Sequence, residues 1–162
     1  MIDYPGKNAC VVFTPGCNFR CPFCHNPESV LPDLIKADRK NFIPDTAFFK
    51  FLETRKGLLE AVSICGGEPT LQPDLYDFAK KIKNMGFSVK FDTNGRDAPI
   101  VEKMIDEQIV DYVAIDLKQI PSKYDLATGV KNRQDFWDNY ERVLSVLKTD
   151  RVDYEYRTTV VK

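Results

Sequence analysis

The sequence predicts an α/β fold, a partial, open (β/α) barrel of parallel strands. Short apolar, β-branched segments alternate with segments of helical spacing, and about five such units fit into the 162 residues. Strand–helix–strand units place their strands parallel through right-handed crossovers. A closed eight-stranded barrel typically needs about 250 residues, so we expect only part of a barrel. A doubly wound sheet is the alternative architecture.

Apolar runs bounded by turn residues predict five strands, at 9–14, 61–65, 88–92, 112–117 and 152–161. Helical spacing predicts four helices between them, at 45–56, 73–85, 99–108 and 134–148. Phe48, Phe51 and Leu52 should face the core from the first helix, and Asn132 should cap the last one. No helix follows the last predicted strand, so we expect a chain truncated from a six-unit barrel.

Composition excludes several classes of function. The net charge is −1, which leaves no basic surface typical of nucleic-acid binding. No apolar run approaches the roughly 20 residues of a membrane-spanning helix, and no signal peptide is visible. We therefore expect a cytoplasmic protein that binds neither nucleic acid nor membrane.

Polar and glycine-rich residues follow the predicted strands. Carboxyl ends of parallel strands meet at one rim, where barrel enzymes place their active sites. Two carboxylates and an ammonium at this rim would suit a zwitterionic amino acid, although each acid could instead be a cap or a solvated loop residue. Paired glycines would let a ligand approach the backbone. These residues are Gly66, Gly67, Glu68, Asp92, Thr93, Asp116 and Lys118.

Three of the five cysteines lie in one short loop after the first strand. Cys17, Cys21 and Cys24 have the spacing C-x₃-C-x₂-C, and nearby prolines keep the loop irregular. Three converging thiolates suit an iron–sulfur cluster. Three ligands leave one iron open, as in catalytic rather than closed metal sites.

Three other hypotheses for the function of this loop stay open. A structural zinc site would use the cysteines with His25, although C-x₂-C-H fits tetrahedral spacings poorly. A redox pair of Cys21 and Cys24 would leave Cys17 without a role. The same C-x₂-C-H pattern also occurs at haem attachment sites, which form in oxidising compartments.

The loop and a later motif resemble the radical S-adenosylmethionine superfamily. Phe23 supplies the aromatic residue of the pattern C-x₃-C-x-(aromatic)-C, and ICGGEPTL at 64–71 resembles that superfamily's glycine-rich second-strand motif. FDTNG at 91–95 and AIDLKQ at 114–119 resemble its glycyl-radical-enzyme activase branch. Within that branch, DYPGK at 3–7 and YRTTVV at 156–161 are most similar to activating proteins of anaerobic ribonucleoside-triphosphate reductases. Pyruvate formate-lyase activating enzymes are a more distant match.

The resemblance implies an enzyme that reductively cleaves S-adenosylmethionine at a [4Fe–4S] cluster. The resulting 5′-deoxyadenosyl radical would take hydrogen from a glycine of a partner, a glycyl radical enzyme. A low-potential donor such as flavodoxin or ferredoxin would supply the electron. Residues 1–162 would form a single core domain, incomplete at both ends. The alternatives are a radical enzyme acting on a small molecule or peptide, and a non-catalytic iron–sulfur or zinc module.

The resemblance also assigns residues. Cys17, Cys21 and Cys24 would bind the cluster, and the amino and carboxylate groups of S-adenosylmethionine would chelate the fourth iron. Around that ligand it places Phe23, Cys24 and His25 at the adenine, Gly66, Gly67 and Glu68 at the methionine end, and Asp116 and Lys118 at its polar part. A monovalent cation would use Asp92, Thr93, Asp116 and the Ala114 carbonyl. Cys65 stands where Ser or Thr is common. We interpret it as a small core residue rather than a fourth cluster ligand.

Overall fold

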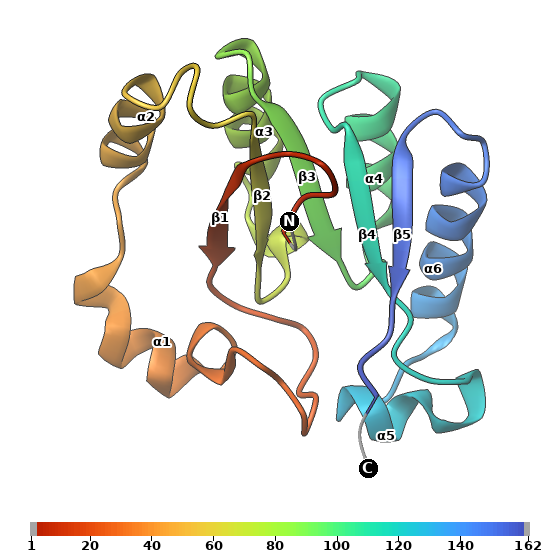
Figure 1. The fold of residues 1–162 in the computed structure, drawn as a ribbon. Coiled ribbons are helices and arrows are strands. Elements are labelled where there is room, and N and C mark those ends of the chain that lie inside the picture. The colour runs from red at the N-terminus through yellow and green to blue at the C-terminus, as the bar shows by residue number, and fades with distance from the viewer. Residues whose placement is uncertain (1–2, 161–162) are drawn as a thin grey trace.

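The computed structural model describes residues 3–160 and contains one sheet of five parallel strands in chain order (Figure 1). The strands are β1 (Ala9–Thr14), β2 (Ala61–Gly66), β3 (Ser88–Thr93), β4 (Tyr112–Asp116) and β5 (Asp153–Arg157). A doubly wound sheet would reverse its strand order at a switch point, and this sheet does not. The predicted open, parallel partial barrel is therefore confirmed. The predicted last strand is shorter than expected, and its final residue, Val161, lies outside the described residues.

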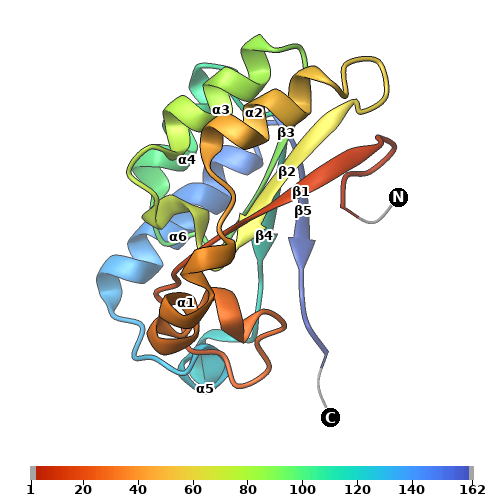
Figure 2. The ribbon, with the colours of Figure 1, turned by 90° about the vertical axis from the view of Figure 1, so that its left-hand side faces the viewer.

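Four helices cover one face of the sheet (Figure 2). They are α2 (Asp45–Glu53), α3 (Leu75–Asn84), α4 (Ala98–Asp106) and α6 (Gln134–Leu147), close to the predicted ranges. Two short helices, α1 (Pro32–Asp38) and α5 (Tyr124–Thr128), lie beyond the carboxyl ends of the strands (Figure 1). Four 3₁₀ turns complete the elements, at Pro27–Ser29, Arg39–Asn41, Pro69–Leu71 and Pro121–Lys123. None of the helices in the described range is long and apolar enough to span a bilayer.

Side-chain alternation divides the sheet into an apolar and a polar face. The residues that face the helices are fully buried in the hydrophobic core: Val62, Ile64, Val89, Phe91, Val113 and Ile115. Their neighbours on the other face are mostly polar, among them Ser63, Lys90, Asp92, Glu155 and Arg157. The inner face of the open barrel is therefore built for polar contacts rather than for a second helix layer.

Two predictions about the helices were wrong. Phe51 is 38% exposed, and Phe49 is buried instead, because the stripe of α2 that meets Phe78 of α3 runs through Phe48, Phe49 and Leu52. The N-cap of α6 is Arg133 rather than Asn132.

The amide of Asn132 is already used by the loop after α5. It donates to Asp125 Oδ1 at 3.0 Å and to Thr128 Oγ1 at 2.8 Å. The side chain therefore closes this loop and does not cap the helix that follows.

Helix α1 and the turns around it were not predicted from the sequence. No residue of α1 is buried, so its sequence has no apolar stripe of helical spacing.

The cap of α4 provides a first testable effect. Asp97 Oδ1 accepts a hydrogen bond from Ile100 N at 3.3 Å, whereas Asp74 at the start of α3 makes no such bond. Asp97→Ala should therefore cost about 1 kcal/mol of unfolding free energy, and Asp74→Ala less than half of that. Urea denaturation of both variants measures the difference. Equal losses would contradict the capping role of Asp97.

Candidate active site

The cysteine loop is fixed at its start by backbone hydrogen bonds. Gly16 N donates to Ser29 O at 2.7 Å, and Gly16 O accepts from Glu68 N at 2.7 Å. The side-chain amide of Gln72 donates to Pro15 O at 2.6 Å. The loop after β1 thus rests directly on the segment after β2.

Gly66 and Gly67 make this contact possible. A Cβ at Gly67 would lie 1.8 Å from Gly16 O, and one at Gly66 would lie 2.2 Å from Thr14 N. Gly66 also has a φ of +120°, which only glycine adopts readily. The sequence predicted that these glycines admit a ligand. In the structure Gly66 admits the backbone of β1 at Thr14, and Gly67 admits the backbone of the cysteine loop at Gly16.

The middle of the loop is fixed by an aromatic side chain. Phe19 is 1% exposed and packs edge-on against Tyr124 of α5 and Phe136 of α6. Arg20 N donates to Thr128 O at 2.7 Å, and Gly129 leaves the space that Arg20 O occupies. Phe19 was not predicted as a core residue, because an aromatic residue between cysteines has no periodicity that marks it as core.

Glu68 connects β2 to the end of β3. Its side chain is 1% exposed, and its oxygens accept from Thr70 Oγ1 at 2.7 Å, Thr93 Oγ1 at 2.9 Å and Asn94 N at 2.7 Å. Burial raises the pKa of this carboxyl group, and the hydrogen bonds oppose that rise. The structure therefore places Glu68 and Thr93 in one buried network.

A further link joins this network to the cysteine loop. Asn94 Nδ2 donates to Asn18 Oδ1 at 2.6 Å. Asn18 stands directly after Cys17, so the end of β3 contacts the loop beside its first cysteine. Sequence analysis assigned no role to this pair, and nothing in the spacing of the two residues marks them as partners.

The three thiols of the loop are half-buried and are not in disulfides. Burial raises the pKa of Cys17 to about 11 and also raises the pKa of Cys21, while the nearby Lys118 ammonium lowers both. Cys17 and Cys21 therefore stay protonated at neutral pH unless a metal binds them. Three soft ligands on one short, anchored loop fit a cluster that needs thiolates at separate irons.

The zinc alternative receives no support. Among residues 3–160, no three His, Cys, Asp or Glu side chains are grouped so that they could hold one metal ion. His25 is exposed. A cluster differs from zinc because each thiolate binds a different iron.

Cys65 lies on the polar inner face. Burial raises its pKa to about 12, and the charged groups that affect it include Asp92, Lys90 and Arg157. These neighbours are inner-face residues rather than members of the cysteine loop.

The two predicted carboxylates at the strand ends are paired with protein cations. Asp92 forms ion pairs with Lys90, which is fully buried, and with Arg157. Burial raises the pKa of Asp92 against the effect of these cations. Asp116 Oδ2 lies 2.9 Å from Lys118 Nζ. The structure gives no support to a monovalent cation between Asp92, Thr93 and Asp116, because Thr93 donates to Glu68 and both carboxylates are neutralised.

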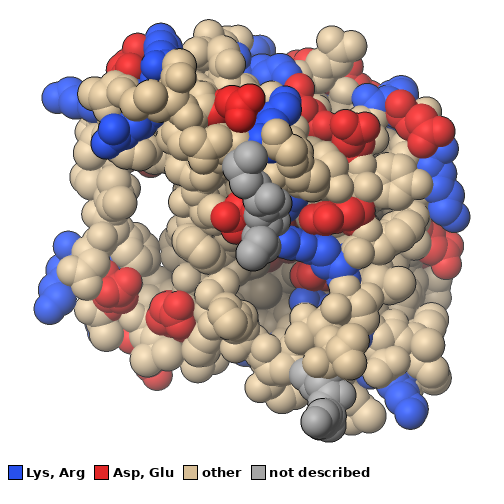
Figure 3. Space-filling view, in the orientation of Figure 1, with Lys and Arg blue, Asp and Glu red and all other residues tan. Residues whose placement is uncertain are grey.

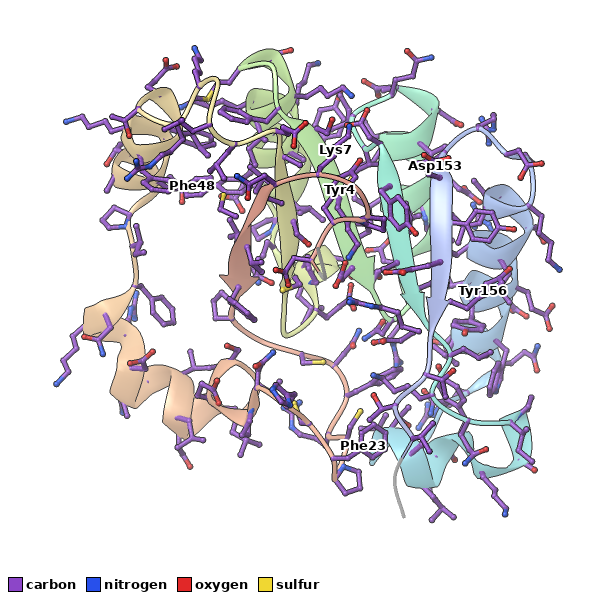
Figure 4. The ribbon with its side chains drawn as sticks, viewed as in Figure 1. Tyr4, Lys7, Phe23, Phe48, Asp153 and Tyr156 are labelled. Carbon is purple, nitrogen blue, oxygen red and sulfur yellow. The ribbon has the colours of Figure 1, made fainter. Side chains whose placement is uncertain are left out.

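An apolar groove of about 870 Å³ adjoins the cysteine loop. Phe23 lines it with Leu117, Lys118 and Ile120, at the end of the molecule where α5 lies (Figure 4). The groove is open along one side, so a planar ligand could lie against Phe23 near the cysteines. Phe23 and Lys118 thus line the same groove.

The segment before β1 crosses the inner face of the sheet (Figures 2 and 4). Tyr4 is 4% exposed and packs on Tyr112, with ring centroids 5.6 Å apart, and Lys7 Nζ donates to Ser88 Oγ at 2.5 Å. This segment shields part of the polar face from water.

The buried Tyr4 predicts a loss of stability at high pH. Burial, with a smaller effect of Asp111, raises the pKa of Tyr4 to about 12. The folded protein then holds this proton more tightly than the unfolded chain. Protonated Tyr4 therefore contributes about 2 kcal/mol to the free energy of unfolding. This contribution is complete below pH ~10 and is lost as the pH rises through ~12. In Tyr4→Phe the fall in unfolding free energy over this range should be smaller. Parallel curves for the two proteins would contradict this prediction.

Comparison with known proteins agrees with this geometry. The family model described as the Radical SAM superfamily matches residues 11–154. The chain therefore belongs to the radical S-adenosylmethionine superfamily. Within it, the chain is 37% identical to a protein of Methanocaldococcus jannaschii whose provisional name is glycyl-radical enzyme activating enzyme, over 99% of this chain. It is 32% identical, over 76% of its length, to a pyruvate formate-lyase-activating enzyme of Listeria monocytogenes. The predicted branch of the superfamily is thus confirmed.

The matched relatives and the proteins of the matched solved structures are longer than this chain. It spans 64% of the M. jannaschii relative and 52% of the Listeria enzyme. SuiB of Streptococcus suis, solved bound to S-adenosylmethionine, superposes with a TM-score of 0.68 at 18% identity, over 96% of this chain and 33% of SuiB. TYW1 superposes with a TM-score of 0.61 at 19% identity, over 94% of this chain and 56% of that protein. These likenesses support the fold.

Proposed function

We propose that this protein reductively cleaves S-adenosylmethionine and generates a glycyl radical on a partner enzyme. The observation that carries the proposal is the cysteine loop, which the Gly66–Glu68 segment, Asn94 and Phe19 hold in one conformation at the carboxyl rim of the sheet. Cys17, Cys21 and Cys24 would hold the [4Fe–4S] cluster. When bound, the cluster supplies the electron that breaks the sulfonium carbon–sulfur bond and gives methionine and the 5′-deoxyadenosyl radical.

The chain's own residues bind and orient the ligand. Lys118 stands between Asp116 and the cysteines, where its ammonium would face the carboxylate of the ligand. Phe23 would lie along the adenine, in the groove that it lines. Tyr4 and its segment exclude water from the inner face. A monovalent cation is not part of the proposal, since Asp92 and Asp116 are already paired with Lys90, Arg157 and Lys118.

The partner proposed is an anaerobic ribonucleoside-triphosphate reductase, on the resemblance of the sequence motifs. A cytoplasmic flavodoxin or ferredoxin would be the electron donor. The relatives named for glycyl-radical and pyruvate formate-lyase activation support this class of partner. A radical enzyme acting on a small molecule or peptide is the alternative, and electron spin resonance with the partner present separates the two.

The test begins with anaerobic reconstitution of the protein with iron and sulfide. After reduction, S-adenosylmethionine should yield 5′-deoxyadenosine, and Cys17→Ser should yield none. Cys10→Ser is the matched control, since Cys10 packs against the core on β1 and should leave the yield unchanged. An intact cluster that gives no 5′-deoxyadenosine would refute the proposal, and a colourless protein with stoichiometric zinc would favour the non-catalytic module.

A further inference from the structure

The first strand of the sheet has a free edge. Among the described residues β1 pairs with β2 alone. The carbonyl oxygens of Asn8 and Thr14 accept bonds from the β2 side, from Ala61 N at 3.3 Å and Gly67 N at 2.8 Å. Backbone groups point to alternate sides along a parallel strand. Val11 and Phe13 therefore direct their N–H and C=O groups to the outer edge.

An apolar hollow lies beside this edge. It has a volume of about 450 Å³ and opens between β1 and the segment that joins α1 to α2, where Figure 3 shows a gap through the surface. Phe48 points into this region from α2 (Figure 4). Phe42 and Ile43, which line it, are 43% and 72% exposed. The other apolar residues of the lining are Val11, Val12, Phe13, Pro15, Leu75 and Phe78.

The polar part of the lining is acidic. Four carboxylates contribute to it, and none of them is in an ion pair within residues 3–160: Glu28, Asp38, Asp45 and Asp74. Asp38 accepts a hydrogen bond from Asn41 at 2.6 Å. The basic residues of the same segment, Lys36, Arg39 and Lys40, do not line the hollow. The site therefore combines negative charge with exposed apolar surface.

We propose that the β1 edge binds an extended segment of a partner protein that carries both apolar and basic side chains on one face. The segment would join the sheet as an added strand, through backbone bonds to Val11 and Phe13. Successive side chains of a strand point to opposite faces. The side chains of one face would therefore enter the hollow, where the apolar ones would pack against Phe48 and the basic ones would meet the carboxylates.

A second copy of this chain is a poorer occupant of the edge. Pairing β1 with β1 of another copy would bring two acidic linings together, and like charges at such an interface oppose association. The proposal does not rest on the radical chemistry, since binding at this edge needs neither cluster nor S-adenosylmethionine.

The test uses a fluorescein-labelled lysine–valine peptide, in which valine and lysine take turns at the odd positions and threonine fills the even ones, so that both lie on one face. Its anisotropy is measured against the protein. Binding should weaken as salt rises. It should also weaken at least about tenfold when alternate peptide amides are methylated, since methylation removes the donors that a strand needs. The glutamate–valine peptide, which has glutamate in place of each lysine, should bind at least about tenfold more weakly.

Val11→Pro tests the edge on the protein side. The N–H of Val11 points outward, so proline there removes an outer donor and leaves the bonds to β2 in place. We expect at least about a tenfold loss of affinity. Tyr156→Pro is the matched control. Arg157 O accepts from Leu117 N of the β4 side, so Tyr156 directs its N–H to the outer edge of β5. This control should bind as the wild type does.

Three outcomes would overturn the proposal: no binding of the lysine–valine peptide, equal binding of the glutamate–valine peptide, or unchanged binding by Val11→Pro. A concentration-dependent dimer that Val11→Pro abolishes would assign the edge to a second copy instead. If Val11→Pro does not fold, the double change Asp38→Asn and Asp45→Asn replaces it. The two carboxylates are exposed, and their loss should weaken binding and remove most of its salt dependence.

Discussion

Gly67→Ala is expected to prevent cluster assembly and to cost about 4 kcal/mol or more of unfolding free energy. The added Cβ would lie 1.8 Å from Gly16 O and 3.0 Å from Ser29 O, both of them backbone atoms. Backbone cannot move aside as a flexible side chain does, so the cysteine loop must leave the Gly66–Glu68 segment. That displacement breaks the bond from Glu68 N to Gly16 O and shifts Cys17. Losses of this size are exceptional and indicate a specific steric cause.

The measurements are iron content after anaerobic reconstitution and urea denaturation of the metal-free protein. Gly57→Ala is the control. Gly57 also has a positive φ, +78°, but no atom lies within 4 Å of the added Cβ. It should lose about 1–2 kcal/mol from backbone strain and bind iron normally. Normal iron content in Gly67→Ala would show that the loop does not depend on this contact.

The sequence predicted the sheet well because each strand is a short apolar run between turn residues. It predicted the cysteine loop because three cysteines within eight residues have few structural explanations. The expectation that strand ends meet at one rim follows from parallel topology alone, and the contact between Gly67 and Gly16 confirms it.

The supports of the loop were not predictable in the same way. Asn18 and Asn94 are 76 positions apart, and Arg20 meets Thr128 through backbone atoms. Neither contact leaves a trace in spacing or composition, because the two asparagines follow no periodic pattern and a backbone acceptor has no residue type. The sequence predicted the motif acids as site residues. However, Glu68 and Asp92 differ in what they face, and only the fold shows that Glu68 is enclosed by donors while Asp92 meets cations.

Glu68→Gln is expected to cost about 3 kcal/mol in the metal-free protein. The carboxylate is buried, and its two oxygens face N–H and O–H donors from Thr70, Thr93 and Asn94. A glutamine has one oxygen and one NH₂ group, so at least one donor faces another donor. A bond to a charged acceptor is worth about 1.5–3 kcal/mol, and a buried unpaired donor costs about 1–3 kcal/mol. The loss should also release Asn94 from Asn18 and thereby loosen the loop beside Cys17.

This variant separates two roles of Glu68. A residue that only contacted the methionine end of the ligand would leave the metal-free protein as stable as the wild type, with an effect only when S-adenosylmethionine is bound. If Glu68 instead positions the loop, its substitution lowers the stability of the metal-free protein before any ligand is added, and the iron content falls as well. Urea denaturation without metal, followed by reconstitution, measures both. Glu60→Gln is a matched control, because Glu60 is exposed and, within residues 3–160, its side chain accepts only from Asn8 N, at 2.9 Å. This change should cost less than about 1 kcal/mol. An unchanged metal-free stability for Glu68→Gln would assign Glu68 to the ligand instead.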